Sequence, residues 1–416
     1  MTSSVSVSVR EIIVMGATGS VGTQAVEVVL GNPELFSVTG LTAGSNLGLL
    51  AEQAVRLGAC RIGLAQAPAG GEPEVRQALT EVAQRLGLPD RVEQIELGPE
   101  AGVRIAGTPA DMVLNAVTGA VGLRSTLAAL DAGTDVALAN KESLIVGGPL
   151  VLEAAARTGA RLIPVDSEHS AIAQALRAGR AEEVDRLVIT ASGGPFRGMR
   201  RAELDAVTPA QALAHPTWTM GSVITTNSAT LVNKGLEVIE AQLLFGVDYD
   251  RIDVVVHPQS QIHSMVQFVD GSTIAQVSPP DMKLPIAYAL GTHGAGEPRR
   301  ISGATRPNDW TRATEWTFEP VDHEAFPALG LAYEAGRRGG THPSVYNAAN
   351  EVLVDAFHDG RITFPQIADG IAAALATHHS DASGRALDLD SVLSADAAAR
   401  ERTSSWIERA APGIAR

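Results

Sequence analysis

The sequence predicts an α/β fold with an N-terminal doubly wound parallel sheet, a central α+β domain and a C-terminal helical domain. Three observations support this prediction. Short apolar runs alternate with helical segments as far as residue 165, a pattern typical of parallel sheets. Strands mixed with loops rich in Gly, Pro, His and Ser then follow. From residue 323 onward, apolar residues recur mainly at helical spacing.

The first strand is expected at residues 11–15, where a β-branched apolar run ends at Gly16. Residues 21–30 have an apolar face at helical spacing, so a strand, a glycine loop and a helix follow one another. Residues 62–76 contain two glycines in succession and two prolines, and are expected to form a surface loop. Further strands are expected at residues 38–41, 110–117, 136–139 and 162–165.

The central and C-terminal regions are expected to hold strands at residues 187–190 and 252–256 and helices at residues 346–358 and 365–377. Residues 291–320 carry several Gly and Pro without a clear period, which indicates a linker across the surface. The predicted domains are therefore residues 1–165, 166–291 and 319–416, with residues 292–318 as the linker.

The composition is that of a folded protein. The chain has 416 residues, of which 45% are hydrophobic and 19% charged, with a net charge of −15. This acidic balance argues against a nucleic-acid partner, and no apolar run approaches the roughly 18 residues that cross a membrane. The single cysteine, Cys60, fits a reducing compartment, so a cytoplasmic location is expected.

The basic residues are strongly biased toward arginine. Only Lys141, Lys234 and Lys283 are lysines among the 32 basic residues. A compact ammonium group differs from a guanidinium in geometry and hydration, so a rare lysine can mark a site that arginine does not fit. Chance retention at the surface is the alternative for each.

The segment Gly16-Ala-Thr-Gly19-Ser-Val-Gly22 has the context of a Rossmann-like dinucleotide-binding loop, because it follows a strand and opens a helix. Its glycines admit a pyrophosphate close to the backbone, and the helix N-terminus offers free N–H groups. A tight turn without a ligand is the alternative.

The end of the second strand bears on the choice of cofactor. An NAD site usually has an acidic residue there, whereas residues 42–46 read Thr-Ala-Gly-Ser-Asn. The missing carboxylate leaves room for a 2′-phosphate and favours NADPH, although no Lys or Arg in this stretch would hold that phosphate.

The tripeptide Asp166-Ser167-Glu168 follows a predicted strand. If it continues the strand edge, the two carboxylates point to the same side and can converge on one cation. Two solvated acids at a strand end are the alternative.

Residues 227–239 are expected to form one helix with Thr230, Asn233, Lys234 and Glu237 on a polar stripe. The preceding loop, residues 215–221, combines His, Trp and Met and is a plausible mobile cover for a substrate. A solvent-facing stripe is the plainer interpretation of the helix alone.

Asp166, Glu168 and Glu237 together offer three oxygen ligands, which suit Mg²⁺ or Mn²⁺ better than zinc. Hydroxyl, amide and ammonium donors that match a phosphate come from Ser192, Ser228, Asn233 and Lys234. The two histidines of the segment 257–263 are unconvincing metal ligands. His257 fits a core or loop role, and His263 fits either a substrate contact or structural support.

Taken in order along nearly the whole chain, these motifs resemble one family closely, the 1-deoxy-D-xylulose 5-phosphate reductoisomerases of the non-mevalonate isoprenoid pathway. The resemblance is carried by residues 16–22 (GATGSVG), 139–144 (ANKESL), 166–171 (DSEHSA), 191–196 (ASGGPF), 215–221 (HPTWTMG), 227–237 (NSATLVNKGLE) and 257–266 (HPQSQIHSMV).

The resemblance implies a homodimeric enzyme that rearranges the ketose phosphate to a branched aldehyde and reduces it with NADPH to 2-C-methyl-D-erythritol 4-phosphate. It implies an NADPH-binding domain at residues 1–165 and a catalytic domain at residues 166–291. Asp166, Glu168 and Glu237 would ligate Mg²⁺ or Mn²⁺, and Lys141 and Glu168 are the candidates for catalytic proton transfer.

The resemblance also implies the remaining site residues. Those at the substrate would be Lys141, Ser167, Glu168, Ser192, His215, Trp218, Met220, Ser228, Asn233, Lys234, Glu237 and His263, with Trp218 and Met220 on the mobile loop. Those at the cofactor would be Thr18, Gly19, Ser20, Val21, Gly44, Ser45, Asn46, Asn140, Glu142 and Gly221. Ser45 is a departure, because many relatives have a basic residue there beside the 2′-phosphate.

Three alternatives are less favoured by the sequence. Aldehyde dehydrogenation through a thioester needs a nucleophilic cysteine in the second domain, whereas Cys60 lies in the first. Hydride transfer of the homoserine dehydrogenase type would not require the three-carboxylate cluster. A regulatory protein that only binds NADPH would not need the substrate-side residues.

Overall fold

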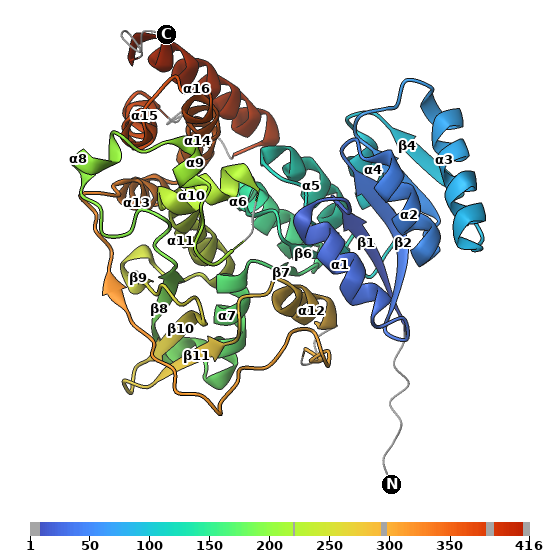
Figure 1. The fold of residues 1–416 in the computed structure, drawn as a ribbon, viewed down its shortest axis with the longest axis horizontal. Helices are drawn as coiled ribbons and strands as arrows, with labels where there is room; N and C mark the ends of the chain where they lie inside the picture. Colours follow the sequence, from blue (N-terminus) through green and yellow to red (C-terminus); the bar gives the residue numbers. More distant parts are fainter. Residues whose placement is uncertain (1–8, 219–220, 293–297, 380–386, 411–416) are drawn as a thin grey trace. The chain divides into compact units, whose positions relative to one another are not determined.

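The computed structural model describes residues 9–218, 221–292, 298–379 and 387–410, and it divides into two compact units (Figure 1). The first unit takes in residues 1–143, 151–166 and 281–305, and the second takes in residues 144–150, 167–280 and 306–416. Among the described residues, no helix is both long and apolar enough to cross a membrane.

A seven-stranded parallel sheet forms the centre of the first unit, in the order β4-β3-β2-β1-β5-β6-β7. The predicted doubly wound sheet is therefore confirmed. The strands are β1 (Arg10–Met15), β2 (Phe36–Ala43), β3 (Arg61–Leu64), β4 (Gln94–Leu97), β5 (Met112–Asn115), β6 (Asp135–Leu138) and β7 (Leu162–Pro164). The helices are α1 (Ser20–Leu30), α2 (Leu47–Leu57), α3 (Gly71–Leu86), α4 (Ala101–Ala106), α5 (Leu123–Asp131), α6 (Lys141–Thr158) and α12 (Lys283–Gly291).

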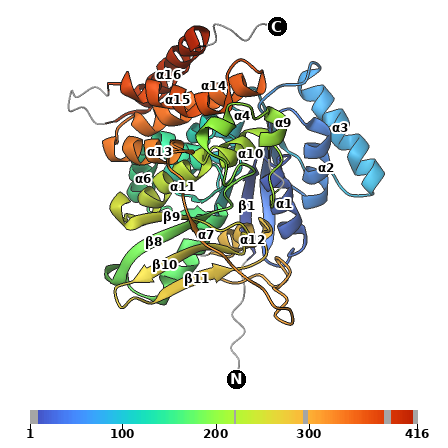
Figure 2. The ribbon, with the colours of Figure 1, turned by 60° about the vertical axis from the view of Figure 1, so that its left-hand side comes forward.

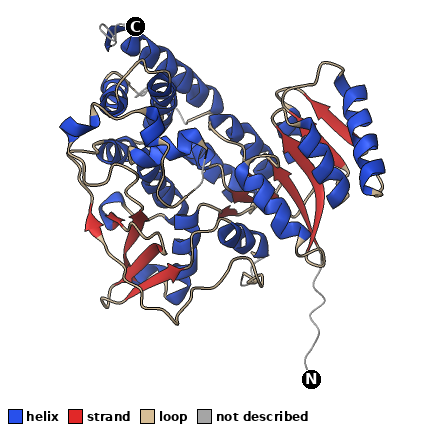
Figure 3. Ribbon diagram, in the orientation of Figure 1, coloured by secondary structure: helices blue, strands red, loops and turns tan. Residues whose placement is uncertain are grey.

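Helices cover both faces of this sheet, which is why its strands read as continuous apolar runs (Figure 3). Ile12 and Val14 of β1 join the core formed with α1, α2 and α12. Ile13 and Met15 point to the opposite face, where Ile13 lies close to Gly40 and Met15 to Gly102 of α4.

The position of helix α12 does not match the domain boundary predicted at residue 291. It was expected in the domain 166–291, but it packs against α1, and Pro285 to Leu290 are all buried in the first unit. Lys283 at its start forms an ion pair of 2.5 Å with Glu27 of α1. This lysine therefore has a structural partner in the first unit.

Residues 62–76 do not form the predicted loop. They contain most of β3 and the start of α3. Ile62 and Leu64 are fully buried, and Pro73 lies in the first turn of α3, where a missing N–H costs no helix hydrogen bond. The glycines and prolines mark the connection between a strand and a helix, not a long loop.

The second unit contains a five-stranded mixed sheet in the order β11-β10-β8-β9-β12. Its strands are β8 (Val184–Ala191), β9 (Ile252–Val256), β10 (Ile262–Phe268), β11 (Thr273–Val277) and β12 (Glu319–Pro320). Helices α7 (Ser167–Ala175) and α11 (Val232–Phe245) share a buried core with β8, β9 and β10. The sheet thus supports the two helices that carry Glu168 and Glu237, two of the three predicted cation ligands.

The C-terminal region is helical, as predicted, and its helices gather together in Figure 2. They share one core with α10 (Ser222–Ala229) and α11, so they do not form a core of their own. The C-terminal helices are α13 (Ala328–Arg338), α14 (His342–His358), α15 (Phe364–Ala376) and α16 (Leu389–Ala410), and two short helices, α8 (Arg201–Leu204) and α9 (Pro209–Ala212), lie earlier in the chain. Residues 298–318 contain no helix or strand.

Two local predictions around the site are wrong. The helix predicted over residues 227–239 is interrupted between α10 and α11, because Leu231 has a left-handed conformation with a φ of 60°. Strand β7 ends at Pro164, and Ser167 begins helix α7, so Asp166 and Glu168 do not lie on a strand edge. Glu168 lies in the first turn of α7, where the helix dipole favours a negative charge.

Candidate active site

The glycine loop of the first unit lies at the carboxyl end of β1. Gly16 has a φ of 68°, and a Cβ there would lie 2.6 Å from the main-chain oxygen of Ala116. A Cβ on Gly22 would lie 2.2 Å from the main-chain oxygen of Gly16. These two glycines are therefore required by the turn itself. Gly19 and Ser20 are exposed, with Thr18 and Val21 half-buried beside them, at the N-terminus of α1.

Gly44, Ser45 and Asn46 are exposed at the carboxyl end of β2, which is the neighbour of β1 in the sheet. Asn46 caps α2 by accepting a hydrogen bond of 3.2 Å from the main-chain N–H of Leu49. A Cβ on Gly44 would meet nothing within 4 Å. This end of the sheet therefore presents an open surface beside the glycine loop.

Asn140 and Glu142 lie where β6 passes into α6. The buried Asn140 side chain donates to the main-chain oxygen of Gly119 at 2.9 Å and to Glu142 Oε2 at 3.1 Å, and it accepts from the N–H of Ser143. Strand order reverses between β1 and β5, and nucleotides bind at such a switch point in open α/β sheets. Lys141, which lies between Asn140 and Glu142 in the sequence, forms an ion pair with Asp166.

In the second unit, helices α7 and α11 bring Glu168, Lys234 and Glu237 together. Lys234 Nζ lies 3.2 Å from Glu168 Oε1 and donates to Glu237 Oε2. Asn233 Nδ2 donates to the other oxygen of Glu237. Lys234 is 4% exposed and Glu237 is 1% exposed, so the polar stripe of this helix faces the protein interior and not solvent.

One ligand atom each from Asp166, Glu168 and Glu237 lies within 4.8 Å of the others. Asp166 is the last residue before α7 and ends one of the three segments of the first unit. Three carboxylates this close repel one another unless cations lie near them. An all-oxygen set of donors fits the preference of Mg²⁺ and Mn²⁺, so these residues could hold such an ion.

His215 connects Ser192, Ser228 and the loop that leads to Trp218. Its Nδ1 accepts hydrogen bonds from the main-chain N–H groups of Thr217 and Trp218, at 3.1 and 2.9 Å. The hydrogen of a neutral ring must then be on Nε2, which lies 3.0 Å from Ser192 Oγ and 3.2 Å from Ser228 Oγ. Burial lowers the pKa of His215, which favours this neutral form.

His263 is buried, and its Nε2 donates to the main-chain oxygen of Ser278 at 3.2 Å. Burial is the main cause that lowers its pKa to about 4. The ring of Trp218 lies edge-on to the imidazole, which places His263 beside the start of the predicted mobile loop. Met220 lies outside the described residues, and Gly221 is the exposed N-cap of α10.

His257 has a structural role, in agreement with its sequence interpretation. Its Nδ1 donates to the main-chain oxygen of Thr317 at 2.9 Å, while Nε2 accepts from the N–H groups of Gln261 and Ile262. Both ring nitrogens are therefore engaged by the main chain.

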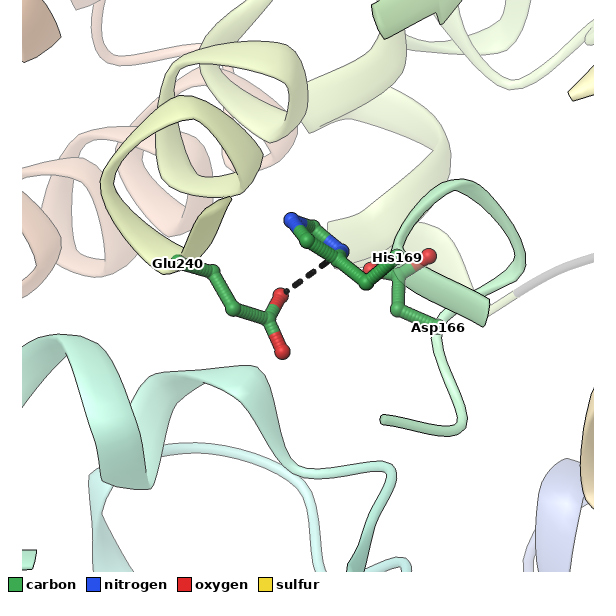
Figure 4. Close-up of side chains that lie close together, drawn as sticks. All are labelled: Asp166, His169 and Glu240. Atoms are coloured by element: carbon green, nitrogen blue, oxygen red, sulfur yellow. Dashed lines mark ion pairs between the residues drawn. The ribbon is translucent and has the colours of Figure 1, made fainter. Parts of the chain in front are cut away.

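Two buried residues next to the carboxylates, His169 and Glu240, received no role in the sequence analysis (Figure 4). They form an ion pair, and together with Asp166 they make a second group whose ligand atoms lie within 4.8 Å of one another. Two signals could have found them. His169 directly follows Glu168, and Glu240 lies three residues after Glu237 on the same helical face.

The chain combines a nucleotide-binding type of sheet with a carboxylate cluster and a set of donors suited to a phosphate. This combination defines the class of dinucleotide-dependent oxidoreductases that act on a polar, anionic substrate. Three family models match the chain. Residues 12–148 match 1-deoxy-D-xylulose 5-phosphate reductoisomerase, residues 162–245 match the C-terminal domain of that enzyme, and residues 277–402 match a DXP reductoisomerase C-terminal domain.

Individual relatives agree with these models. The 1-deoxy-D-xylulose 5-phosphate reductoisomerase of Pseudarthrobacter chlorophenolicus is 58% identical over 394 residues, which cover 94% of this chain and 97% of the relative. A solved structure of the Zymomonas mobilis enzyme in complex with NADPH is 39% identical with a TM-score of 0.86, over 96% of this chain and 99% of that one. A DOX-P reductoisomerase in complex with NADPH, fosmidomycin and magnesium is 34% identical with a TM-score of 0.86, over 97% and 100% of the two chains.

The chain therefore belongs to the 1-deoxy-D-xylulose 5-phosphate reductoisomerase family. It is an NADP-dependent oxidoreductase. These matching relatives are reductoisomerases, so the homoserine dehydrogenase type of reaction is not assigned to this chain.

Proposed function

We propose that this chain converts 1-deoxy-D-xylulose 5-phosphate to 2-C-methyl-D-erythritol 4-phosphate in the synthesis of isoprenoid precursors, with NADPH as reductant and Mg²⁺ or Mn²⁺ as the cation. The reaction isomerises the carbon skeleton to a branched aldehyde and then adds a hydride and a proton to that aldehyde. The observation that carries this proposal is the cluster of Glu168, Lys234 and Glu237, in a chain that matches the family over nearly its whole length.

The first unit would hold the cofactor. Its glycine loop offers the free N–H groups of the α1 N-terminus to the pyrophosphate, and Gly44 to Asn46 lie exposed at the next strand. Other contacts are assigned by resemblance to Asn140 and Glu142, and to Gly221 of the second unit. The full cofactor set is Thr18, Gly19, Ser20, Val21, Gly44, Ser45, Asn46, Asn140, Glu142 and Gly221.

Asp166, Glu168 and Glu237 would hold the divalent cation. When bound, NADPH supplies the hydride, and the cation supplies Lewis-acid stabilisation of the negative charge that develops on the substrate oxygens. The three carboxylates would balance the charge of the ion.

The phosphate group of the substrate would be bound by Ser192, His215, Ser228, Asn233 and Lys234. An Nε2–H on His215 donates toward the two serine hydroxyls, so their own hydrogens are free to turn toward a phosphate oxygen. The ammonium of Lys234 adds the positive charge.

Lys141 and Glu168 remain the proposed groups for proton transfer, with Ser167 beside them. Lys141 pairs with Asp166, and Ser167 Oγ donates to Glu168 Oε2 at 2.5 Å. Both Lys141 and Glu168 therefore lie in hydrogen-bonded networks that can take up or deliver a proton. Trp218 and Met220 would close over the substrate and exclude water, and His263, whose ring lies edge-on to Trp218, would contact the substrate.

A second copy of the chain is the proposed partner, as the resemblance suggested. Strand β11 lies at the edge of the second sheet, where main-chain groups can pair with another strand. Val269 and Ile274 near that edge are exposed, as are Trp310 and Phe318 of the linker. Light scattering that gives twice the mass of 43.2 kDa would support the dimer. The cytoplasm is the proposed location, which the single, half-buried Cys60 supports.

Identification of the product tests the proposed function. The purified chain is incubated with 1-deoxy-D-xylulose 5-phosphate labelled with ¹³C in the carbon skeleton, NADPH and Mg²⁺. Nuclear magnetic resonance should show the label in a branched polyol phosphate. A straight-chain reduced sugar phosphate would contradict the rearrangement.

A further inference from the structure

His169 and Glu240 are buried ionisable residues beside the proposed cation site, and the proposed function gives them no role (Figure 4). His169 follows Glu168 in α7, and Glu240 lies one turn after Glu237 in α11. Both are 0% exposed. A buried carboxylate is strongly unfavourable unless it is paired. Apolar side chains would fill the same space at less cost, so packing alone does not explain why two ionisable residues occur here.

The imidazole of His169 connects the two helices. Its Nε2 lies 2.8 Å from the main-chain oxygen of Glu237, and because a carbonyl can only accept, this nitrogen carries a hydrogen. Its Nδ1 lies 3.3 Å from Glu240 Oε2. The ring also stacks against Phe245, with centroids 6.3 Å apart and an interplanar angle of 15°. The position and rotation of the imidazole are thus fixed from three directions.

The hydrogen bond to Glu237 acts on the main chain of a proposed cation ligand. Glu168 and Glu237 come from different helices, so the spacing of their carboxylates depends on the alignment of α7 with α11. His169 lies next to Glu168 and holds the carbonyl of Glu237, so it sets that alignment at the point where the ligands meet.

We propose that His169 and Glu240 are positioning residues that hold Glu168 and Glu237 at the spacing required for the divalent cation. Glu240 orients the imidazole, and the imidazole orients the ligand-bearing helix. This proposal rests on the proposed function, which assigns the cation ligands. Mutation of residues that orient metal ligands in this way typically weakens metal affinity by about 10- to 100-fold.

The same two residues, with Asp166, could instead form a second cation site, because their ligand atoms lie within 4.8 Å of one another. Asp166 belongs to both groups, and an ion held by three carboxylates already uses it. Positioning therefore accounts for His169 and Glu240 without a second ion, and the number of bound ions separates the two assignments.

Direct titration with Mn²⁺, followed by electron paramagnetic resonance of the free ion, tests the proposal without a measurement of turnover. The variants are His169→Ala, Glu240→Ala and the conservative Glu240→Gln, whose amide can still donate to Nδ1. Val238→Ala is the matched control, because Val238 is fully buried in α11 but packs in the sheet-side core. NADPH affinity and the melting temperature are measured for every variant.

Wild type should bind one Mn²⁺ per chain. His169→Ala and Glu240→Ala should weaken this binding by about 10- to 100-fold, Glu240→Gln should restore most of it, and all three should keep the NADPH affinity. Val238→Ala should lower the melting temperature and leave Mn²⁺ affinity unchanged. A Mn²⁺ affinity unchanged in folded Glu240→Ala would overturn the proposal, as would two ions in wild type and one in that variant.

Glu237→Gln distinguishes the failure of this proposal from the failure of the proposed function. If Glu237→Gln loses Mn²⁺ binding while His169→Ala and Glu240→Ala keep it, only the positioning role is wrong. If Glu237→Gln binds Mn²⁺ as wild type does, the assigned ligands themselves are wrong, and the positioning role fails with them.

Discussion

The indole of Trp218 lies edge-on to the imidazole of His263, with their ring centroids 6.2 Å apart and an interplanar angle of 62°. Trp218 also donates its main-chain N–H to His215, so the start of the loop is attached both to a phosphate-type donor group and to a buried ring. His215 therefore links the start of this loop to the hydroxyls of Ser192 and Ser228.

Trp218→Ala should mainly impair capture of the substrate, because the edge-to-face contact and the apolar cover are lost while the carboxylates stay in place. We expect KM for 1-deoxy-D-xylulose 5-phosphate to rise by about tenfold, the equivalent of roughly 1.4 kcal/mol. The Kd for NADPH should stay the same. Steady-state kinetics with the substrate concentration varied measure this effect. Unchanged KM and kcat would contradict a role for Trp218 in covering the substrate.

Glu237→Gln should lower kcat by about 100-fold or more, because an amide oxygen is a weaker ligand and does not neutralise a divalent cation. NADPH binding, measured by fluorescence, should be nearly intact. Glu319→Gln is the control, since Glu319 lies in the same unit and its carboxylate forms an exposed ion pair with Arg197. Equal activity of Glu237→Gln and Glu319→Gln would exclude Glu237 from the site.

Gly22→Ala should weaken NADPH binding by about tenfold or more, because the added Cβ must displace main-chain atoms of the glycine loop. That Cβ would lie 2.2 Å from the oxygen of Gly16 and 2.6 Å from Cα of Ala17. Gly48→Ala in α2 is the control, since its Cβ would meet nothing within 4 Å. Equal NADPH affinities of the two variants would refute a binding role for the loop.

The stability of the protein should depend on the protonation of His263. Burial lowers its pKa to about 4, whereas an unfolded histidine titrates near 6.5. The unfolded state therefore binds more protons between these two values, so stability is complete above pH 6.5 and falls as the pH decreases toward 4. Over the whole window the loss is about 3 kcal/mol.

His263→Gln checks this assignment, because an amide can still donate to the oxygen of Ser278 but does not titrate. Urea unfolding at pH 7 and pH 4.5 should show a smaller loss of free energy in the variant than in wild type. The same loss in both proteins would place the pH dependence elsewhere.

Much of the fold could be predicted from periodicity, since apolar runs identified seven of the twelve strands in the described part of the chain, namely β1, β2, β5, β6, β7, β8 and β9. What could not be predicted depends on contacts between distant segments. Helix α12 joins the first unit because its apolar surface packs against α1, more than 250 residues away in the chain. No local pattern carries that information.

In the candidate site, too, some features could be predicted from the sequence and others could not. The residue types at Asp166, Glu168 and Glu237 indicated a cation site, but the strand-edge geometry was wrong because Ser167 begins a helix. The left-handed conformation of Leu231 is unusual for a residue other than glycine, so the break before α11 had no signal in the sequence. His169 and Glu240 were missed because their pairing crosses two helices.

The most direct test of the central claim is NADPH oxidation, followed by absorbance, with 1-deoxy-D-xylulose 5-phosphate and Mg²⁺ or Mn²⁺, before and after addition of a chelator. We expect oxidation that requires both the sugar phosphate and the cation, stops with the chelator and returns when the cation is restored in excess. Absence of oxidation in a preparation that binds NADPH, or oxidation that continues in the chelator, would contradict the proposed function.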